Sequence, residues 1–78
     1  MPTVRIIGPY RFYFYSHEPN EPPHIHIDRD SFSAKFWLEE ISLAKNFGFS
    51  QKELHKLQEL VEKNQKQFLG KWYEYFGP

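Results

Sequence analysis

Strict alternation of side-chain types over residues 24–38 is the feature that most constrains the fold of this chain. His24–Asp28 reads His, Ile, His, Ile, Asp, and Ser31–Leu38 carries its most apolar side chains at every second position. A period of two residues is typical of strands that bury one face. A short polar stretch around Arg29-Asp30 separates the two segments, so we predict that they form a β-hairpin.

The alternation also assigns the two faces of this hairpin. Apolar residues such as Ile25 and Phe36 are expected to point toward the helices, and the residues between them point away. A tight turn centred on Arg29-Asp30 would set His26 opposite Ser33 and His24 opposite Lys35, so register and face agree.

Two further strands are predicted near the N-terminal end, at Thr3–Ile7 and Tyr10–Tyr15, because β-branched and aromatic residues favour extended structure. Glu39–Asn46 is predicted as a short helix that ends at Gly48. Ser50, three residues before a glutamate, has the spacing of a helix N-cap, and we predict one long helix from there to the Gly-Pro at the C-terminal end.

The expected fold is therefore α+β. An antiparallel sheet of three or four strands is covered on one face by a short helix and a long C-terminal helix. A chain of 78 residues is near the lower size limit for a hydrophobic core, so we expect a single domain spanning residues 1–78.

Composition excludes several functional classes. Ten basic residues balance ten acidic ones, which argues against a strongly basic nucleic-acid-binding protein. The chain has no cysteine, so it has no disulfide framework, zinc finger or thiol nucleophile. No apolar run approaches the roughly 20 residues that span a bilayer, and the N-terminus does not read as a secretory signal. We expect a cytoplasmic protein with no membrane partner and no cofactor.

The sheet face that points away from the helices is the candidate site. Large aromatic area on an exposed face usually marks a partner site. The predicted catalytic residues are His24, His26 and Lys35. The predicted substrate-binding residues are Arg11, Tyr13, Tyr15 and Trp37.

Three interpretations of the two histidines stay open at this point. Their rings lie on one strand face, with Cα atoms about 6–7 Å apart, so they could supply an acid and a base. They could share a metal with a third ligand from His17, Glu18 or Asp28, although no metal site is assigned. They could also be ordinary polar residues on a face that water or a partner covers.

Three segments of the chain resemble a known family: YRFYFYSHEPNEPPHIHID, AKFWLEEISLAKNFGFS and KWYEYFG. They are similar to the small bacterial proteins of domain-of-unknown-function family 4160. The resemblance implies a partner, because such proteins are commonly encoded beside a second small protein, in pairs that look like toxin–antitoxin modules. It brings no assignment of catalytic residues.

The expected function is therefore that of one component of a bacterial toxin–antitoxin-like module. As an RNA-directed toxin, it would use His24 and His26 for acid/base chemistry and Lys35 or Arg11 to stabilise phosphate charge, while an aromatic ring such as Tyr13 or Trp37 stacks on a base. The alternative is a non-enzymatic protein-binding module, an antitoxin or a transcriptional adaptor, which neutral charge favours. The many aromatics in so short a chain also favour a homodimer.

Overall fold

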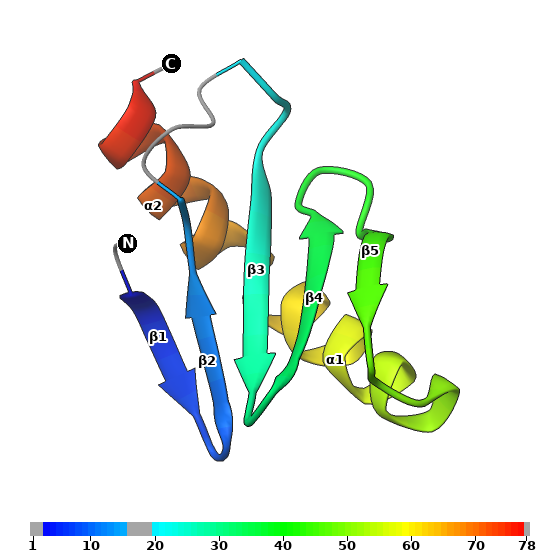
Figure 1. Ribbon diagram of the computed structural model, residues 1–78. Helices are drawn as coiled ribbons and strands as arrows, with labels where there is room; N and C mark the ends of the chain where they lie inside the picture. The colour runs from blue at the N-terminus through cyan, green and yellow to red at the C-terminus, as the bar shows by residue number, and fades with distance from the viewer. Residues whose placement is uncertain (1–2, 16–19, 78) are drawn as a thin grey trace.

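The structure is a computed structural model that describes residues 3–15 and 20–77. It has an α+β fold, in which five strands form one antiparallel sheet and two helices follow (Figure 1). The elements are β1 (Thr3–Ile7), β2 (Tyr10–Tyr13), β3 (His24–Arg29), β4 (Phe32–Trp37), β5 (Ser42–Phe47), α1 (Gln51–Lys63) and α2 (Gln65–Phe76).

The sheet is an open meander in which each strand pairs with its neighbour along the chain, in the order β1-β2-β3-β4-β5. Both helices lie on the same face of the sheet (Figure 1). The core forms between this face and the helices, for example where the rings of Phe12 and Phe68 lie 5.2 Å apart. Ile25, Ile27 and Phe36 are buried in the same core, as the alternation predicted.

The prediction of a short helix over Glu39–Asn46 is wrong, because Ser42–Phe47 is the edge strand β5. A four-residue turn after β4 reverses the chain, and Ile41 adopts a positive φ of 47° there. At the other end of β5, the side chain of Asn46 exchanges two hydrogen bonds of 3.0 Å with the backbone N–H and C=O of Phe49. Pairing with β4 and this side-chain clamp stabilise the extended form, so the sheet has five strands instead of three or four.

The register of the β3–β4 hairpin also differs from the prediction, by two residues. The turn consists of Asp30 and Ser31, and Asp30 takes the positive φ of 56° that the turn requires. His26 therefore lies opposite Lys35, and His24 lies opposite Trp37. A shift of two residues keeps every side chain on its predicted face of the strand.

The predicted long helix is two helices of similar length, separated at Asn64. The Asn64 side chain donates a hydrogen bond to the Leu60 carbonyl and accepts one from Arg5 of β1, both 2.8 Å long. The hydrogen bond from Arg5, in the distant strand β1, thus stabilises the interruption between α1 and α2 at Asn64. Gly70 lies inside α2.

The start of α1 is where the sequence placed it. The hydroxyl of Ser50 accepts a hydrogen bond of 3.2 Å from the backbone N–H of Glu53. The Glu53 carboxylate does not bind back to the start of α1. It accepts two hydrogen bonds from Arg29, of 2.6 and 2.8 Å, and one of 2.7 Å from the hydroxyl of Tyr10. These bonds fix α1 to the end of the β3–β4 hairpin and to β2.

The helices of the described residues, of 13 and 12 residues, are too short and too polar to cross a membrane.

Candidate functional site

The face of the sheet opposite the helices is hereafter the open face. By register and alternation, it comprises Arg11, Tyr13, Tyr15, His26, Asp28, Ser33, Lys35, Trp37, Lys45 and Phe47. Six of the seven sequence-predicted site residues belong to it. The seventh, His24, is described separately below.

The centre of the open face is an aromatic cluster of Tyr13, Tyr15 and His26. The ring of Tyr13 stacks on that of His26, with centroids 5.3 Å apart. The ring of Tyr15 meets both neighbours edge-on, at 4.5 Å from His26 and 5.5 Å from Tyr13. Tyr13 is only 3% exposed, so Tyr15 and His26 present the surface of this cluster.

Tyr13 is held in its neutral form. Its hydroxyl donates a hydrogen bond of 2.9 Å to a carboxylate oxygen of Asp28. Burial raises the pKa of Tyr13 well above its usual range, and the neighbouring Tyr15 and Asp28 raise it further. Tyr13 is thus a structural member of the open face, and its ring is covered rather than available for stacking on a base.

Lys35 is a buried cation with a defined partner. It is 7% exposed, and its ammonium group forms an ion pair with the carboxylate of Glu21, in the segment that precedes β3. The same ammonium lies 4.7 Å from the centre of the Trp37 ring, within reach of a cation–π interaction. A buried charge needs such compensation, so Glu21 satisfies Lys35 in this structure.

Register places His24 opposite Trp37 and so on the predicted face, but Trp72 of α2 covers its ring, so His24 is not exposed as the sequence predicted. It is the first residue of β3, at the end of the sheet where α2 lies (Figure 1). Its ring is fully buried, 4.8 Å from the ring of Trp72 in α2 and 5.7 Å from that of Trp37. Its Nδ1 is 2.9 Å from the carbonyl oxygen of Pro22, at hydrogen-bonding distance. The centroids of the His24 and His26 rings are 5.1 Å apart, but the His24 ring is enclosed.

Arg11 and Trp37 flank the aromatic cluster on opposite sides. The guanidinium of Arg11 lies 4.6 Å from the centre of the Tyr13 ring and donates a hydrogen bond of 2.9 Å to the hydroxyl of Thr3. Trp37 lines a separate depression with Pro22 and Pro23. The seven predicted residues are therefore neighbours, but they do not share one cavity.

A hollow of about 230 Å³ opens on the open face. Four of the predicted residues border it, namely Tyr13, Tyr15, His26 and Lys35, together with Glu21, Ser33, Ala34, Lys45 and Phe47. Small-molecule sites usually have about 300–1,000 Å³, so this hollow suits a single side chain or a small anion better than a cofactor.

Glu21, Lys45 and Phe47 also border this hollow but were not among the predicted site residues. Lys45 and Phe47 were hidden because their segment was predicted as a helix, whereas they share one face of β5. The sequence signal that could have indicated Glu21 is its position just before Pro22-Pro23, because these prolines lead directly into β3.

The metal interpretation of the histidines finds no support among residues 3–15 and 20–77, where no three His, Asp or Glu side chains group as ligands. Of the third ligands considered, His17 and Glu18 lie outside the described residues.

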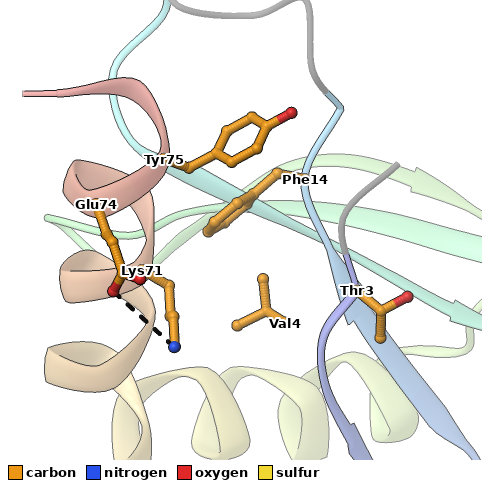
Figure 2. A pocket seen from close by; sticks show the side chains of 6 residues that line it. All are labelled: Thr3, Val4, Phe14, Lys71, Glu74 and Tyr75. Carbon is orange, nitrogen blue, oxygen red and sulfur yellow. Dashed lines mark ion pairs between the residues drawn. The ribbon is translucent and has the colours of Figure 1, made fainter.

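A second hollow, of about 210 Å³, lies between β1 and α2. Val4, Phe14 and Tyr75 border it, and Lys71 and Glu74 form an ion pair of 3.9 Å at its rim (Figure 2). None of the predicted site residues lies there, and the charges at its rim compensate each other. The open face is therefore the stronger candidate site.

Comparison with known proteins identifies the family of the chain. Residues 10–73 match a family model described as a domain of unknown function, DUF4160. No curated protein matches the chain. No solved structure matches it either. The match covers β2 to β5, α1 and most of α2, and with them every strand that contributes to the hollow. The chain therefore belongs to the DUF4160 family of proteins.

Proposed function

We propose that this protein is a non-enzymatic component of a two-protein bacterial module of the toxin–antitoxin kind, and that it binds its partner protein through the open face. The partner is the small protein encoded beside it. The complex forms in the cytoplasm.

The burial of His24 is the observation that carries this proposal. Cleavage of RNA by a pair of histidines requires both imidazoles to reach the same substrate, one as acid and one as base. The His24 ring is fully enclosed between Trp37 and Trp72, so His26 alone borders the surface hollow. A buried imidazole packed against two indoles supports the fold, whereas the surface around it supports binding.

The composition of the open face favours a protein as the ligand. Tyr15 and Phe47 are 39% and 62% exposed, and aromatic residues are enriched at the centres of protein interfaces. Of the cations that border the hollow, Lys35 is already paired with Glu21. The chain has zero net charge, which gives little of the electrostatic attraction on which RNA binding depends.

Co-expression with the neighbouring protein tests the proposal. A tagged chain should co-purify with the neighbour, and the neighbour should change the growth phenotype of cells that express the chain alone. The double variant Tyr15→Ala, Phe47→Ala should weaken the complex at least about tenfold, since central aromatic residues dominate interface energies. Lys52→Ala and Glu62→Ala, on exposed positions of α1, are matched controls that should bind as the wild type does. No complex, or a complex that both pairs of substitutions affect equally, would refute the proposal.

An RNA-directed toxin is the second candidate, favoured by one observation: His26, Lys35 and Lys45 border the same hollow as the hydroxyl-bearing Tyr15 and Ser33. In this case the chain expressed alone inhibits growth and degrades RNA. The variant His26→Ala, which leaves the buried His24 in place, would then abolish inhibition while the protein stays folded. Retained inhibition would remove this candidate.

A further inference from the structure

β5 is an edge strand with one unpaired side. It pairs with β4, and no strand of the described residues pairs with its other side. The unpaired backbone N–H and C=O groups of such an edge are a template for another strand. Two of its side chains, Leu43 and Phe47, are 42% and 62% exposed, so the edge also offers apolar contact area.

The charge along one row of the open face is unbalanced at this edge. Tyr13, His26, Lys35 and Lys45 lie opposite one another on four successive strands. Lys45 thus has another lysine as its cross-strand neighbour, and that neighbour is already paired with Glu21. Opposite charges on adjacent strands stabilise a sheet, and like charges destabilise it. The next position of this row, beyond β5, is therefore suited to a carboxylate.

A second copy of this chain does not meet that requirement. Symmetric pairing of two β5 strands would be antiparallel, and Ser42–Phe47 contains no acidic residue. No register within the strand therefore sets a carboxylate opposite Lys45. A register centred on Lys45 sets the two lysines against each other.

We propose that the free edge of β5 binds an extended segment of the partner protein by strand addition. In this segment, an acidic residue lies opposite Lys45, and an apolar residue two positions away packs on Phe47. The two requirements have this spacing because Lys45 and Phe47 are two residues apart on the same face of β5. Backbone hydrogen bonds provide affinity in this mode, and the side chains select the sequence. The inference rests on the proposed function and names the chemistry of the partner.

A peptide with the sequence Thr-Val-Thr-Glu-Thr-Val-Thr, blocked at both ends, is the probe. Its central Glu has an apolar residue two positions away on either side, so both strand directions satisfy Lys45 and Phe47. We expect amide chemical-shift changes concentrated in residues 42–47 on titration of the labelled protein. The same peptide with Lys in place of Glu should bind about 2- to 30-fold more weakly, because a favourable cross-strand charge pair is replaced by an unfavourable one of similar size.

Charge reversal makes the test specific. Lys45→Glu should invert the preference, so that the lysine peptide binds better than the glutamate peptide. Lys66→Glu on the exposed surface of α2 makes the same change of net charge and should leave the preference unchanged. Replacing the two central Thr residues of the peptide by Pro removes backbone donors and should abolish binding by strand addition.

Three results of the peptide titrations would overturn the inference: no binding of the glutamate peptide, equal binding of both peptides to the wild type, or undiminished binding of the proline peptide. Co-purification with the neighbouring protein separates this failure from that of the proposed function. A complex that forms equally well with Lys45→Glu refutes the edge-strand inference and leaves the proposed function standing. Absence of any complex refutes the proposed function even if the peptide preference holds.

Discussion

Gly48 connects β5 to α1, and its replacement by alanine should strongly destabilise the protein. Gly48 has a φ of 108°, in a region that residues with a side chain rarely adopt. A Cβ added there would lie 2.4 Å from Cδ1 of the Phe32 ring, so the ring or the backbone would have to move. The backbone conformation costs about 1–3 kcal/mol. The overlap adds about 1–3 kcal/mol, as overpacking does elsewhere.

The predicted loss of about 2–6 kcal/mol is large beside the total of about 5–15 kcal/mol that stabilises typical domains. For a chain of this size it lowers Tm by at least about 8 °C. Circular dichroism melting of Gly48→Ala against the wild type measures the change. Gly70→Ala is the matched control, because Gly70 lies inside α2 and a Cβ there meets no atom within 4 Å. That substitution should raise Tm by about 2–8 °C, since alanine favours a helix over glycine by about 0.5–1 kcal/mol.

A double-mutant cycle separates the two contributions at Gly48. In a Phe32→Ala background the ring atoms that the added Cβ would meet are absent, so Gly48→Ala should cost only the part that comes from the backbone conformation. The reasoning is refuted if Gly48→Ala melts at or above the wild-type temperature. It is also refuted if the cost of Gly48→Ala is the same with and without the ring of Phe32.

Three further predictions concern titration and burial. The pKa of Glu53 lies below its usual 4.5, first because Arg29 and then because Tyr10 donates a hydrogen bond to its carboxylate. The Glu53 carboxylate therefore stabilises the fold fully above pH 4.5 and progressively less as the pH falls through its lowered pKa. Glu53→Gln should flatten the acid side of a plot of Tm against pH. His24→Ala should destabilise the protein by about 2 kcal/mol or more, as truncation of buried large side chains does, whereas His26→Ala should cost clearly less in the same urea titration; equal costs would contradict the difference in burial. Because the pKa of Tyr13 is raised, Tyr13→Phe should not change the number of tyrosines that ionise in an absorbance titration of the folded protein.

Alternation predicted the faces of the sheet well and its connections poorly. Ile25 and Phe36 are in the core as expected, because a period of two fixes the face regardless of register. The turn at Asp30 was misplaced since no Asn-Gly or Asp-Gly pair marks it, and the positive φ of Asp30 is visible only in the structure.

The two helical predictions failed for different reasons. Leu38, Ile41, Ala44 and Phe47 recur at intervals of three residues, a spacing that fits a helix, and only the pairing with β4 makes their segment a strand. The break at Asn64 depends on a hydrogen bond from Arg5, 59 residues earlier in the chain. Neither contact between distant segments can be read from a local pattern.

The candidate site was predicted where it depends on local alternation and missed where it depends on tertiary packing. Tyr15, His26 and Lys35 border one hollow, as residues on the same face of the sheet should. His24 obeys the same alternation, but Trp72 of a helix 48 positions later covers it. Lys45 belongs to the site because its segment is the strand β5 and not the predicted helix.

The meander has a consequence for the way in which the protein acquires its structure. Each strand pairs with the strand that precedes it in the sequence. The loops that must close to form the sheet are therefore short, and closing them has a small entropic cost. Low contact order of this kind accompanies rapid folding, even among β-rich chains. We expect the hairpins to nucleate one after another as the nascent chain emerges, with the two helices completing the hydrophobic layer last.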